Sequence, residues 1–327
     1  MIRLIRLCRF CAMIVILAIC IPGMYAYPKD PVLILRGEGQ EFRDVLSGLT
    51  SEIINDFIIH DMVVTKKTAI SDIESEVTSK KPKLAVLMDN LAISLFKKYH
   101  SGIRDTSQVL PSVSLMGVLV ANAIDGLSNA TGISYEVPAV TSILSLRTVL
   151  NRQINTVGVV HREFLENFIE VNKAFCKKER IDLIDISLPN KSRNMKYLLR
   201  KALAELIETR GIQALWVPND NLLLQSDYIE SVWVPITSQA QIPVIVGVDV
   251  FVNPQMNFGT FAVLPDHLSL GNQAAEIIYN IRENNWKVMK SKVEPPLAIY
   301  KIINYRQAKK SFGISDETLK SIDKVLK

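Results

Sequence analysis

The chain has 327 residues, of which 48% are hydrophobic and 22% are charged. This length fits two domains of ordinary size, and the composition is that of a folded globular protein, so a disordered or low-complexity chain is excluded. The net charge is +5, but without Arg3, Arg6 and Arg9 at the start there are 35 basic residues against 33 acidic ones. A chain so close to neutral gives no electrostatic reason to expect nucleic acid as a partner.

The first 26 residues are predicted to be a secretory signal peptide. Three arginines precede an unbroken apolar run over residues 11–21, and Pro22-Gly23 ends it. A basic head, an apolar middle of about 7–15 residues and a break are typical of such a signal, and a spanning helix needs about 20 apolar residues. We therefore expect an exported, periplasmic protein. Met24 stands where the cleavage site prefers a small residue, so an uncleaved N-terminal anchor is the alternative.

The cysteines give no sign of a disulfide framework. Cys8, Cys11 and Cys20 lie inside the predicted signal, and the rest of the chain keeps only Cys176. An exported protein with one thiol has no internal disulfide and must be stable through its core alone. Cys176 falls in a helical pattern and is expected to be a small buried side chain.

Short β-rich runs then alternate with longer amphipathic ones. The first series predicts strands over 32–35, 57–64, 84–88 and 113–120, with helices over 41–56, 70–79 and 90–103. A second series begins near residue 135. It predicts helices over 139–150, 162–178, 195–210 and 225–238, with strands over 156–160, 182–186, 214–217 and 244–246.

This alternation predicts the fold class. Apolar runs without in/out alternation are typical of strands buried on both faces, and the helices between them favour right-handed crossovers and parallel sheets. We expect an α/β fold of two doubly wound lobes. The N-lobe would comprise residues 27–133 plus 266–285, and the C-lobe residues 134–265 plus 286–327. Crossings near 121–135, 248–266 and 286–298 would then act as a hinge.

Polar side chains follow most of the predicted strands. In open parallel sheets the ligand crevice lies beyond the carboxyl ends of the strands, and a polar rim suits a small polar or zwitterionic solute. Tyr135, near a crossing, would either pack within the hinge or stack its ring on an apolar part of the solute. The other candidate contacts are Glu38, Asp89, Asn90, Asn122, Arg162, Asp220, Asn221 and Asp249.

Several of these residues have a second, purely structural interpretation. Asp220 and Asn221 precede a helix and would cap its free amides, which is worth about 1 kcal/mol; on that basis Asp220→Ala should cost at most about 1–2 kcal/mol of stability. Asp89 would cap the next helix while Asn90 offers its amide to the crevice. Arg162 is either a bidentate clamp for a carboxylate or a solvated residue at a helix start.

Enzyme motifs are absent from the sequence. It contains no phosphate-binding loop, no dinucleotide fingerprint and no nucleophile elbow. His60, His100, His161 and His267 are not spaced as metal ligands on one helix. We therefore expect no catalytic residue, no cofactor and no metal. A hydrolase would require a Ser or Asp beside His161 or His267 in the cleft.

Motifs in the second half resemble one family of ABC-transporter solute-binding proteins. The stretch LWVPNDN at residues 215–221 resembles the family's strand followed by P-x-D-N, and DHLSLGNQAA at 266–275 resembles its D-Y-Y-x-L-G-x-Q-A-A helix start. Further matches in the family's order are NATGIS at 129–134, VGVV at 157–160, IPV at 242–244 and the tail over 303–314. The resemblance covers about residues 115–327.

The resemblance implies the periplasmic-binding-protein type I fold, a monomer without enzymatic activity, a small-molecule solute such as an amino acid, and an ABC permease as partner. Asp89-Asn90 stand where the family often has Ser/Thr-Pro, and Asn122 falls where it often has T-D-P. The identity of the solute therefore does not follow. A membrane sensor kinase or cyclase is the alternative partner. A repressor built on the same lobes is excluded by the signal and by the lack of an N-terminal DNA-binding helix pair.

Overall fold

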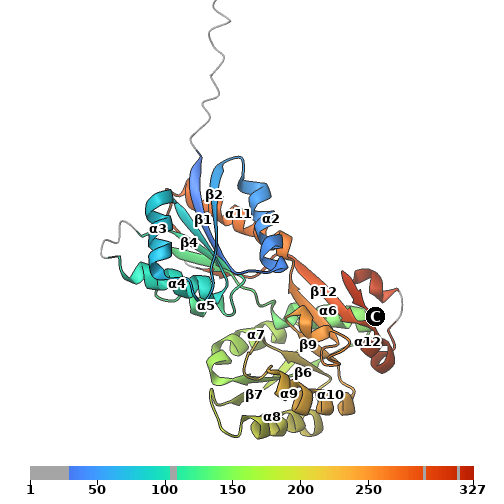
Figure 1. The fold of residues 1–327 in the computed structure, drawn as a ribbon. Coiled ribbons are helices and arrows are strands. Elements are labelled where there is room, and N and C mark those ends of the chain that lie inside the picture. The colour runs from blue at the N-terminus through green and yellow to red at the C-terminus, as the bar shows by residue number, and fades with distance from the viewer. Residues whose placement is uncertain (1–28, 104–108, 290–291, 315–316) are drawn as a thin grey trace, which may run out of the picture.

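The structure is a computed structural model that describes residues 29–103, 109–289, 292–314 and 317–327. The predicted signal peptide lies outside these residues. The described part of the chain forms two lobes, each built around one sheet (Figure 1). The predicted fold class, two doubly wound α/β lobes, is confirmed.

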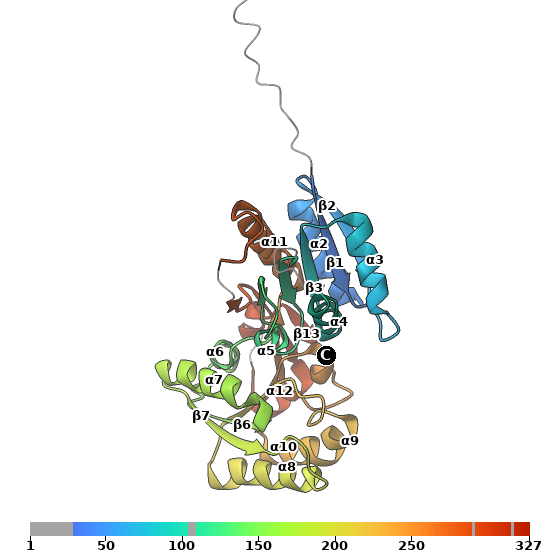
Figure 2. The same cartoon turned by 90° about the vertical axis from the view of Figure 1, so that its left-hand side faces the viewer.

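The N-lobe sheet is parallel throughout and has the strand order β11-β5-β4-β3-β1-β2. Helices α2 and α11 cover one face, and α3, α4 and α5 cover the other (Figure 2). The strands are β1 (Asp30–Arg36), β2 (Phe57–Val63), β3 (Leu84–Met88), β4 (Ser112–Leu115), β5 (Ala130–Ile133) and β11 (Val293–Glu294); the helices are α2 (Gln40–Ile53), α3 (Ile70–Lys80), α4 (Asn90–Ser101), α5 (Val120–Ala123) and α11 (His267–Glu283).

The C-lobe sheet has the order β13-β12-β10-β9-β8-β6-β7 and is parallel except where β12 runs against β10. One face carries α6, α7 and α12, and the other carries α8, α9 and α10. Its strands are β6 (Thr156–Arg162), β7 (Asp182–Leu188), β8 (Ala214–Val217), β9 (Val244–Val246), β10 (Phe261–Pro265), β12 (Ile299–Asn304) and β13 (Lys324–Leu326).

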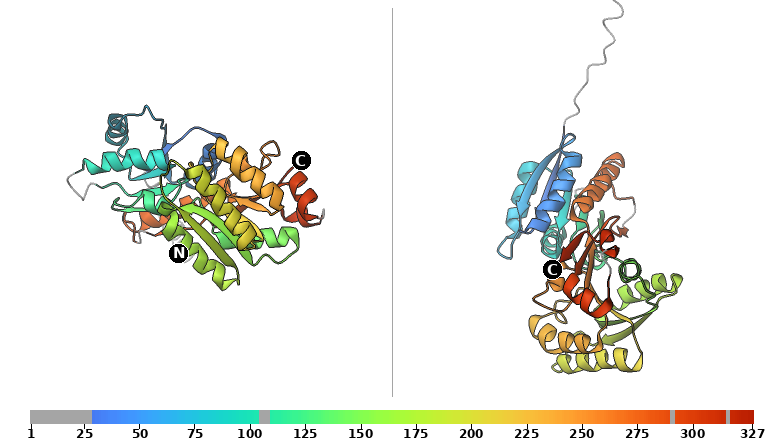
Figure 3. Two further views of the ribbon diagram at one scale, coloured as in Figure 1. Left: turned by 90° about the horizontal axis from the view of Figure 1, so that it is seen from below. Right: turned by 90° about the vertical axis from the view of Figure 1, so that its right-hand side faces the viewer.

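The C-lobe helices are α6 (Ala139–Leu150), α7 (Glu166–Lys178), α8 (Met195–Ala204), α9 (Ser226–Tyr228), α10 (Val234–Ala240) and α12 (Tyr305–Phe312). The short turns η2 (Glu163–Leu165), η5 (Asp249–Val252) and η6 (Thr318–Ser321), and the π-helical turns η3 (Glu205–Thr209) and η4 (Ile229–Trp233), complete this lobe. Figure 3 shows the two lobes from two further sides. Residues of α10 and α12 line one pocket of the C-lobe.

The central strands are buried on both faces. All five residues of β3 and all four of β8 are buried, which explains why their sequences are continuous apolar runs instead of alternating ones. Burial of this much aliphatic surface on both sides of each sheet is the main stabilising term of the fold.

Helices α2 and α11 pack with their backbones in near contact. A Cβ at Gly48 would lie 2.1 Å from the backbone O of Leu268, and a Cβ at Gly271 would lie 2.2 Å from the backbone O of Val45. Only glycine fits at these two positions, because any larger side chain would overlap backbone atoms of the other helix. The glycines therefore fix α11 to the N-lobe.

Among the described residues the chain passes between the lobes three times: between β5 and α6, between β10 and α11, and between β11 and β12. These crossings lie side by side. The N–H of Asp266 donates to the backbone O of Ala298 over 3.1 Å. The buried amide of Gln273 donates to the backbone O of Pro295 and accepts from the N–H of Leu297, each over 3.1 Å.

Several sequence predictions are wrong in detail. The strand predicted over 113–120 ends at Leu115, and residues 120–123 form α5. The C-lobe was predicted to resume at residue 286, but Val293–Glu294 pairs with Gly132 and Ile133 of the N-lobe sheet, so the third crossing spans only 295–298. Strands β5, β10, β12 and β13 were not predicted. β5 and β13 have only four and three residues, and β12 carries Lys301 in its middle, so periodicity alone does not detect them. The apolar run of β10 is as long as that of β3 and was overlooked.

Candidate functional site

A bidentate ion pair joins the end of β6 to the residues that follow β8 in the C-lobe. Arg162, the last residue of β6, donates through Nε and Nη2 to the two carboxylate oxygens of Asp220, each over 2.7 Å. Asp220 Oδ1 also accepts the N–H groups of Leu222 and Leu223. The Asp220 carboxylate, only 3% exposed, therefore accepts four hydrogen bonds from within the protein.

This pair changes the interpretation of three predicted residues. Arg162 does not start a helix; it ends a strand, also donates to the backbone O of Asn190, and lies over the ring of Phe164. Asp220 caps the turn that follows β8, as its structural interpretation required, and its capacity to accept bonds from a solute is largely used. Asn221, the next residue, is exposed.

An unpaired acceptor lies beside this pair. The side-chain oxygen of Asn219 is buried and has no hydrogen-bond partner among the described residues. A Cβ at Gly247, which follows β9, would lie 2.9 Å from that oxygen. Because a buried acceptor without a donor is costly, Asn219 is a candidate contact for a donor group of a bound molecule.

On the N-lobe side, Asp89 and Asn90 are both engaged by the protein. Asp89 follows β3 with a φ of 95°, and its Oδ1 accepts the N–H of Ala92 over 2.8 Å. Burial raises the pKa of the Asp89 carboxyl above its ordinary value. The Asn90 amide binds both the N–H and the O of Val118, so it holds the loop after β4 and is not offered to the crevice as predicted.

The loop after β4 is held in an uncommon conformation. Met116 and Leu119 both have a positive φ, of 59° and 51°, which is rare for side chains of this size. Glu136, in the first crossing, accepts the N–H of Leu119 through its carboxylate over 2.8 Å. Burial raises the pKa of the Glu136 carboxyl. Glu136 thus links the hinge to an N-lobe loop of the crevice.

Two predicted residues, Glu38 and Asn122, have exposed side chains for which the structure gives no hydrogen bond within its described part. Glu38 lies between β1 and α2, and Asn122 lies in α5. Their places on the N-lobe rim are compatible with solute contact, but nothing orients them.

Tyr135 and His267 connect two of the crossings. The Tyr135 hydroxyl lies 2.9 Å from Nε2 of His267, and the two rings are stacked with centroids 5.9 Å apart. Tyr135 precedes α6 of the C-lobe, and His267 begins α11 of the N-lobe. This contact therefore spans the hinge.

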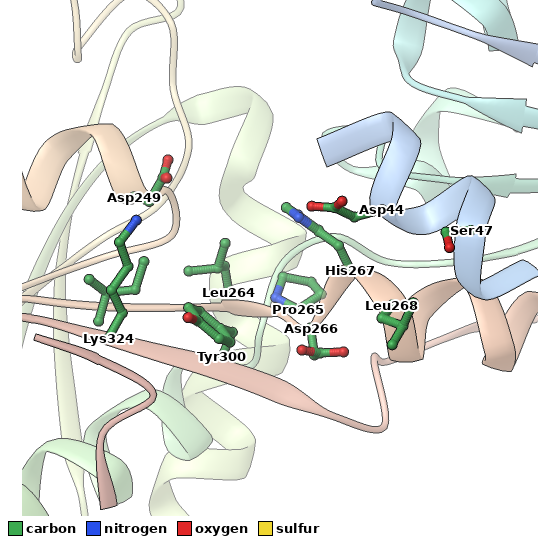
Figure 4. A pocket seen from close by; sticks show the side chains of 11 residues that line it. Asp44, Ser47, Asp249, Leu264, Pro265, Asp266, His267, Leu268, Tyr300 and Lys324 are labelled. Atoms are coloured by element: carbon green, nitrogen blue, oxygen red, sulfur yellow. The ribbon is translucent and has the colours of Figure 1, made fainter. Parts of the chain in front are cut away.

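A cavity of about 430 Å³ opens at this hinge (Figure 4). Asp44 and Ser47 of α2 line it from the N-lobe, and Asp249, Tyr300 and Lys324 line it from the C-lobe. Figure 4 shows Asp44 next to His267, and Lys324 extending toward Asp249. Of the predicted site residues, Asp249 lines this cavity and Tyr135 is bonded to its His267.

The electrostatics of the hinge favour neutral rings. Burial raises the pKa of the Tyr135 hydroxyl, and the carboxylates of Asp249, Glu41 and Glu136 raise it further. Burial lowers the pKa of His267, and nearby acids from both lobes, led by Asp44 and Glu41, only partly oppose this. At neutral pH an uncharged Tyr135 hydroxyl therefore shares a hydrogen bond with an uncharged His267 imidazole.

His267 makes stability depend on pH with a definite sign. Because its pKa is lower in the folded protein, the unfolded chain binds the proton first as the pH falls. The contribution of His267 should thus weaken as the pH falls from the ordinary histidine value, near 6.5, to the lower folded pKa. Urea unfolding measures the free energy of unfolding at pH 7.5 and at pH 5.5. The loss between these two pH values should be smaller for His267→Gln than for the parent, because glutamine can still bond to Tyr135 but does not titrate. An equal loss in both proteins would contradict this assignment.

Sequence reasoning missed Glu41, Asp44, His267 and Lys324. Glu41 and Asp44 lie in the first turns of α2, the helix after β1, and Lys324 belongs to a strand that was not predicted. Glu41 and Asp44 could have been found from the sequence, because the helix after the first strand must begin at the carboxyl edge of the sheet, where a ligand binds.

No protein-family model and no curated protein matches the sequence. Solved structures do match over 91% of the chain, each at 16% identity. A ligand-free, open substrate-binding protein with adhesive properties from Clostridium difficile has a TM-score of 0.64 and is covered over 99% of its length. An ABC domain in complex with L-Trp from Streptococcus pneumoniae (TM-score 0.54) and a conserved domain protein from Vibrio cholerae (0.55) are each covered over 100%.

These similarities establish the fold: the chain has the two-lobed type I fold of periplasmic binding proteins, as the sequence resemblance implied. Within the residues that the structure describes, no helix has the length and apolar character needed to cross a membrane.

Proposed function

We propose that the protein is an exported solute-binding protein that captures a small polar or amphipathic solute between its lobes and delivers it to an ABC permease. One observation carries the proposal: two doubly wound lobes are joined by three short crossings, and polar groups of both lobes line a cavity at that hinge. Such lobes close on a ligand by hinge bending, and the ligand shifts the open–closed equilibrium by its differential affinity.

The greater similarity to an open, ligand-free substrate-binding protein than to an L-Trp complex supports an open resting state. The groups we assign to the solute are Asp249, Asn219, Tyr135 and His267, with Glu38 and Asn122 at the N-lobe rim. Arg162 retains N–H groups beyond those that bind Asp220 and Asn190, and would reach a carboxylate. A solute with both an amine and an acid group fits this set, which favours amino acids.

No chemistry is needed for this role. An acid does lie beside His161, but that imidazole is fully buried and beyond the reach of a substrate. Ser47 and Asp44 share the hinge cavity with His267, whose Nε2 is occupied by Tyr135. These contacts argue against the hydrolase alternative. A membrane sensor in place of the permease would use the same closed lobes.

The test is a thermal-shift screen that starts with amino acids, followed by calorimetry and small-angle X-ray scattering. We expect at least one solute to raise the melting temperature, by an amount that grows with the logarithm of its concentration relative to Kd, and to reduce the radius of gyration. Asp249→Asn should weaken binding at least tenfold. The matched control is Asp182→Asn, at the opposite end of a strand. Binding without compaction, or equal affinity in both variants, would refute capture between the lobes.

A further inference from the structure

A second group of ligating side chains lies in the C-lobe, away from the hinge cavity. His161 of β6, Asp185 of β7 and Glu166 of α7 converge so that their ligating atoms lie within 4.8 Å of one another. Nε2 of His161 is 3.2 Å from Oδ2 of Asp185 and 4.0 Å from Oε2 of Glu166. The proposed solute role does not use this group.

The imidazole of His161 is fully buried, and both of its nitrogens face acceptors. Nδ1 lies 3.1 Å from the backbone O of Arg162. A carbonyl oxygen only accepts, so Nδ1 carries the proton in this contact. Nε2 faces the Asp185 carboxylate, so a cation, either a proton on Nε2 or a metal ion, must lie between these two atoms.

The charge of the surrounding side chains is that of a site for a divalent cation. Lys173 bridges Glu170 and Oδ1 of Asp185, at 2.7 and 2.9 Å, and leaves Oδ2 facing His161. The carboxylates of Glu166, Glu170 and Asp185 exceed the ammonium of Lys173 by two negative charges, which is the charge that a divalent metal ion would balance.

The separations also suit a metal. Zinc binds histidine nitrogen and carboxylate oxygen at about 2.0–2.2 Å with tetrahedral geometry, which places neighbouring ligand atoms about 3.3 Å apart. Nε2 of His161 and Oδ2 of Asp185 already meet this spacing. Glu166 is the first residue of α7 with a half-exposed side chain, so a small rotation brings its carboxylate into place. The Arg162 carbonyl then orients His161 through Nδ1, and Lys173 orients Asp185 through Oδ1, the atoms that would not bind the metal.

We propose that His161, Glu166 and Asp185 bind one zinc ion per chain, with water in the fourth position, and that this ion fastens the start of α7 to strands β6 and β7. Imidazole and carboxylate ligands are compatible with other divalent transition metals, so zinc is the reference ion.

The experiment measures zinc binding to tag-free, chelator-treated protein by calorimetry, and uses cobalt(II) absorption as a spectroscopic probe of the site. The parent should bind one equivalent. Glu166→Gln, which alters a half-exposed side chain and preserves its size, should weaken zinc binding at least tenfold and reduce the cobalt bands. The matched control is Glu179→Gln, an exposed residue at the C-terminal end of the same helix, which should bind zinc within about threefold of the parent.

Circular dichroism before titration establishes that both variants are folded. If the parent takes up no zinc at micromolar concentrations, or if Glu166→Gln and Asp185→Asn both bind it as tightly as the parent, the proposal is overturned and a proton alone joins His161 to Asp185. Because the screen for solutes uses other residues, failure here leaves the proposed solute role unaffected, and the reverse also holds.

Discussion

Replacing Asp220 with alanine is expected to destabilise the protein by about 3 kcal/mol, the lower end of the cost of breaking a buried ion pair, because it leaves the partly buried Arg162 guanidinium without its counter-charge. The variant also removes the acceptor for the N–H groups of Leu222 and Leu223. Urea unfolding followed by circular dichroism measures the loss. This cost is larger than the sequence alone predicts, because capping is only part of what the carboxylate does.

Two controls separate the ion pair from the turn. Asn221→Ala, at the exposed neighbour, should change the unfolding free energy by less than about 0.5 kcal/mol. The double variant Arg162→Met with Asp220→Asn removes both charges and should be more stable than Asp220→Ala. If Asp220→Ala costs less than about 1 kcal/mol, the Arg162–Asp220 pair is not the fixed element described above.

Replacing Gly271 with alanine is expected to destabilise the N-lobe by at least about 3 kcal/mol, at the upper end of the effect of overpacking. The new Cβ would lie 2.2 Å from the backbone O of Val45 and 2.5 Å from the backbone N of Leu49, so α11 would have to move away from α2. Gly48→Ala should act in the same way from the other helix, since its Cβ would meet Leu268.

Glu276→Ala is the matched control, because it changes an exposed residue of α11 and should shift the unfolding free energy by less than about 0.5 kcal/mol. Thermal and urea unfolding measure both variants. A Gly271→Ala protein as stable as the parent would mean that the two helices are not in the close contact described here.

The layout of the fold could be predicted because its signals are local and strong. The runs at 84–88 and 214–217 are continuous and apolar, and the structure gives the same limits for β3 and β8. What could not be predicted comes from distant pairing. Residues 293–294 form a strand only because β5 offers an open edge, and no pattern within two residues can reveal this.

The candidate site was predicted less well than the fold. The strand-end rule identified Arg162, Asp220 and Asp249 as rim residues, but it could not indicate that Arg162 and Asp220 bind each other across an interval of 58 residues. His267, considered from the sequence only as a histidine of a possible hydrolase, was not among the predicted solute contacts. A polar group is available to a ligand only if the folded protein does not already satisfy its hydrogen bonds. The partners that do so are brought together by the fold and cannot be identified from the sequence.

The crossings carry a constraint on how the lobes can move. Proline lies in or next to each of them: Pro138 in the first, Pro295-Pro296 in the third, and Pro265 as the last residue of β10, directly before the second. A pyrrolidine ring locks φ near −65°, so rotation is confined to the few remaining torsions of three parallel connections already bonded to one another. If the lobes close on a solute as proposed, they should therefore move in one direction with little twisting. Connections that are already restricted also lose less conformational entropy on closure than flexible ones would.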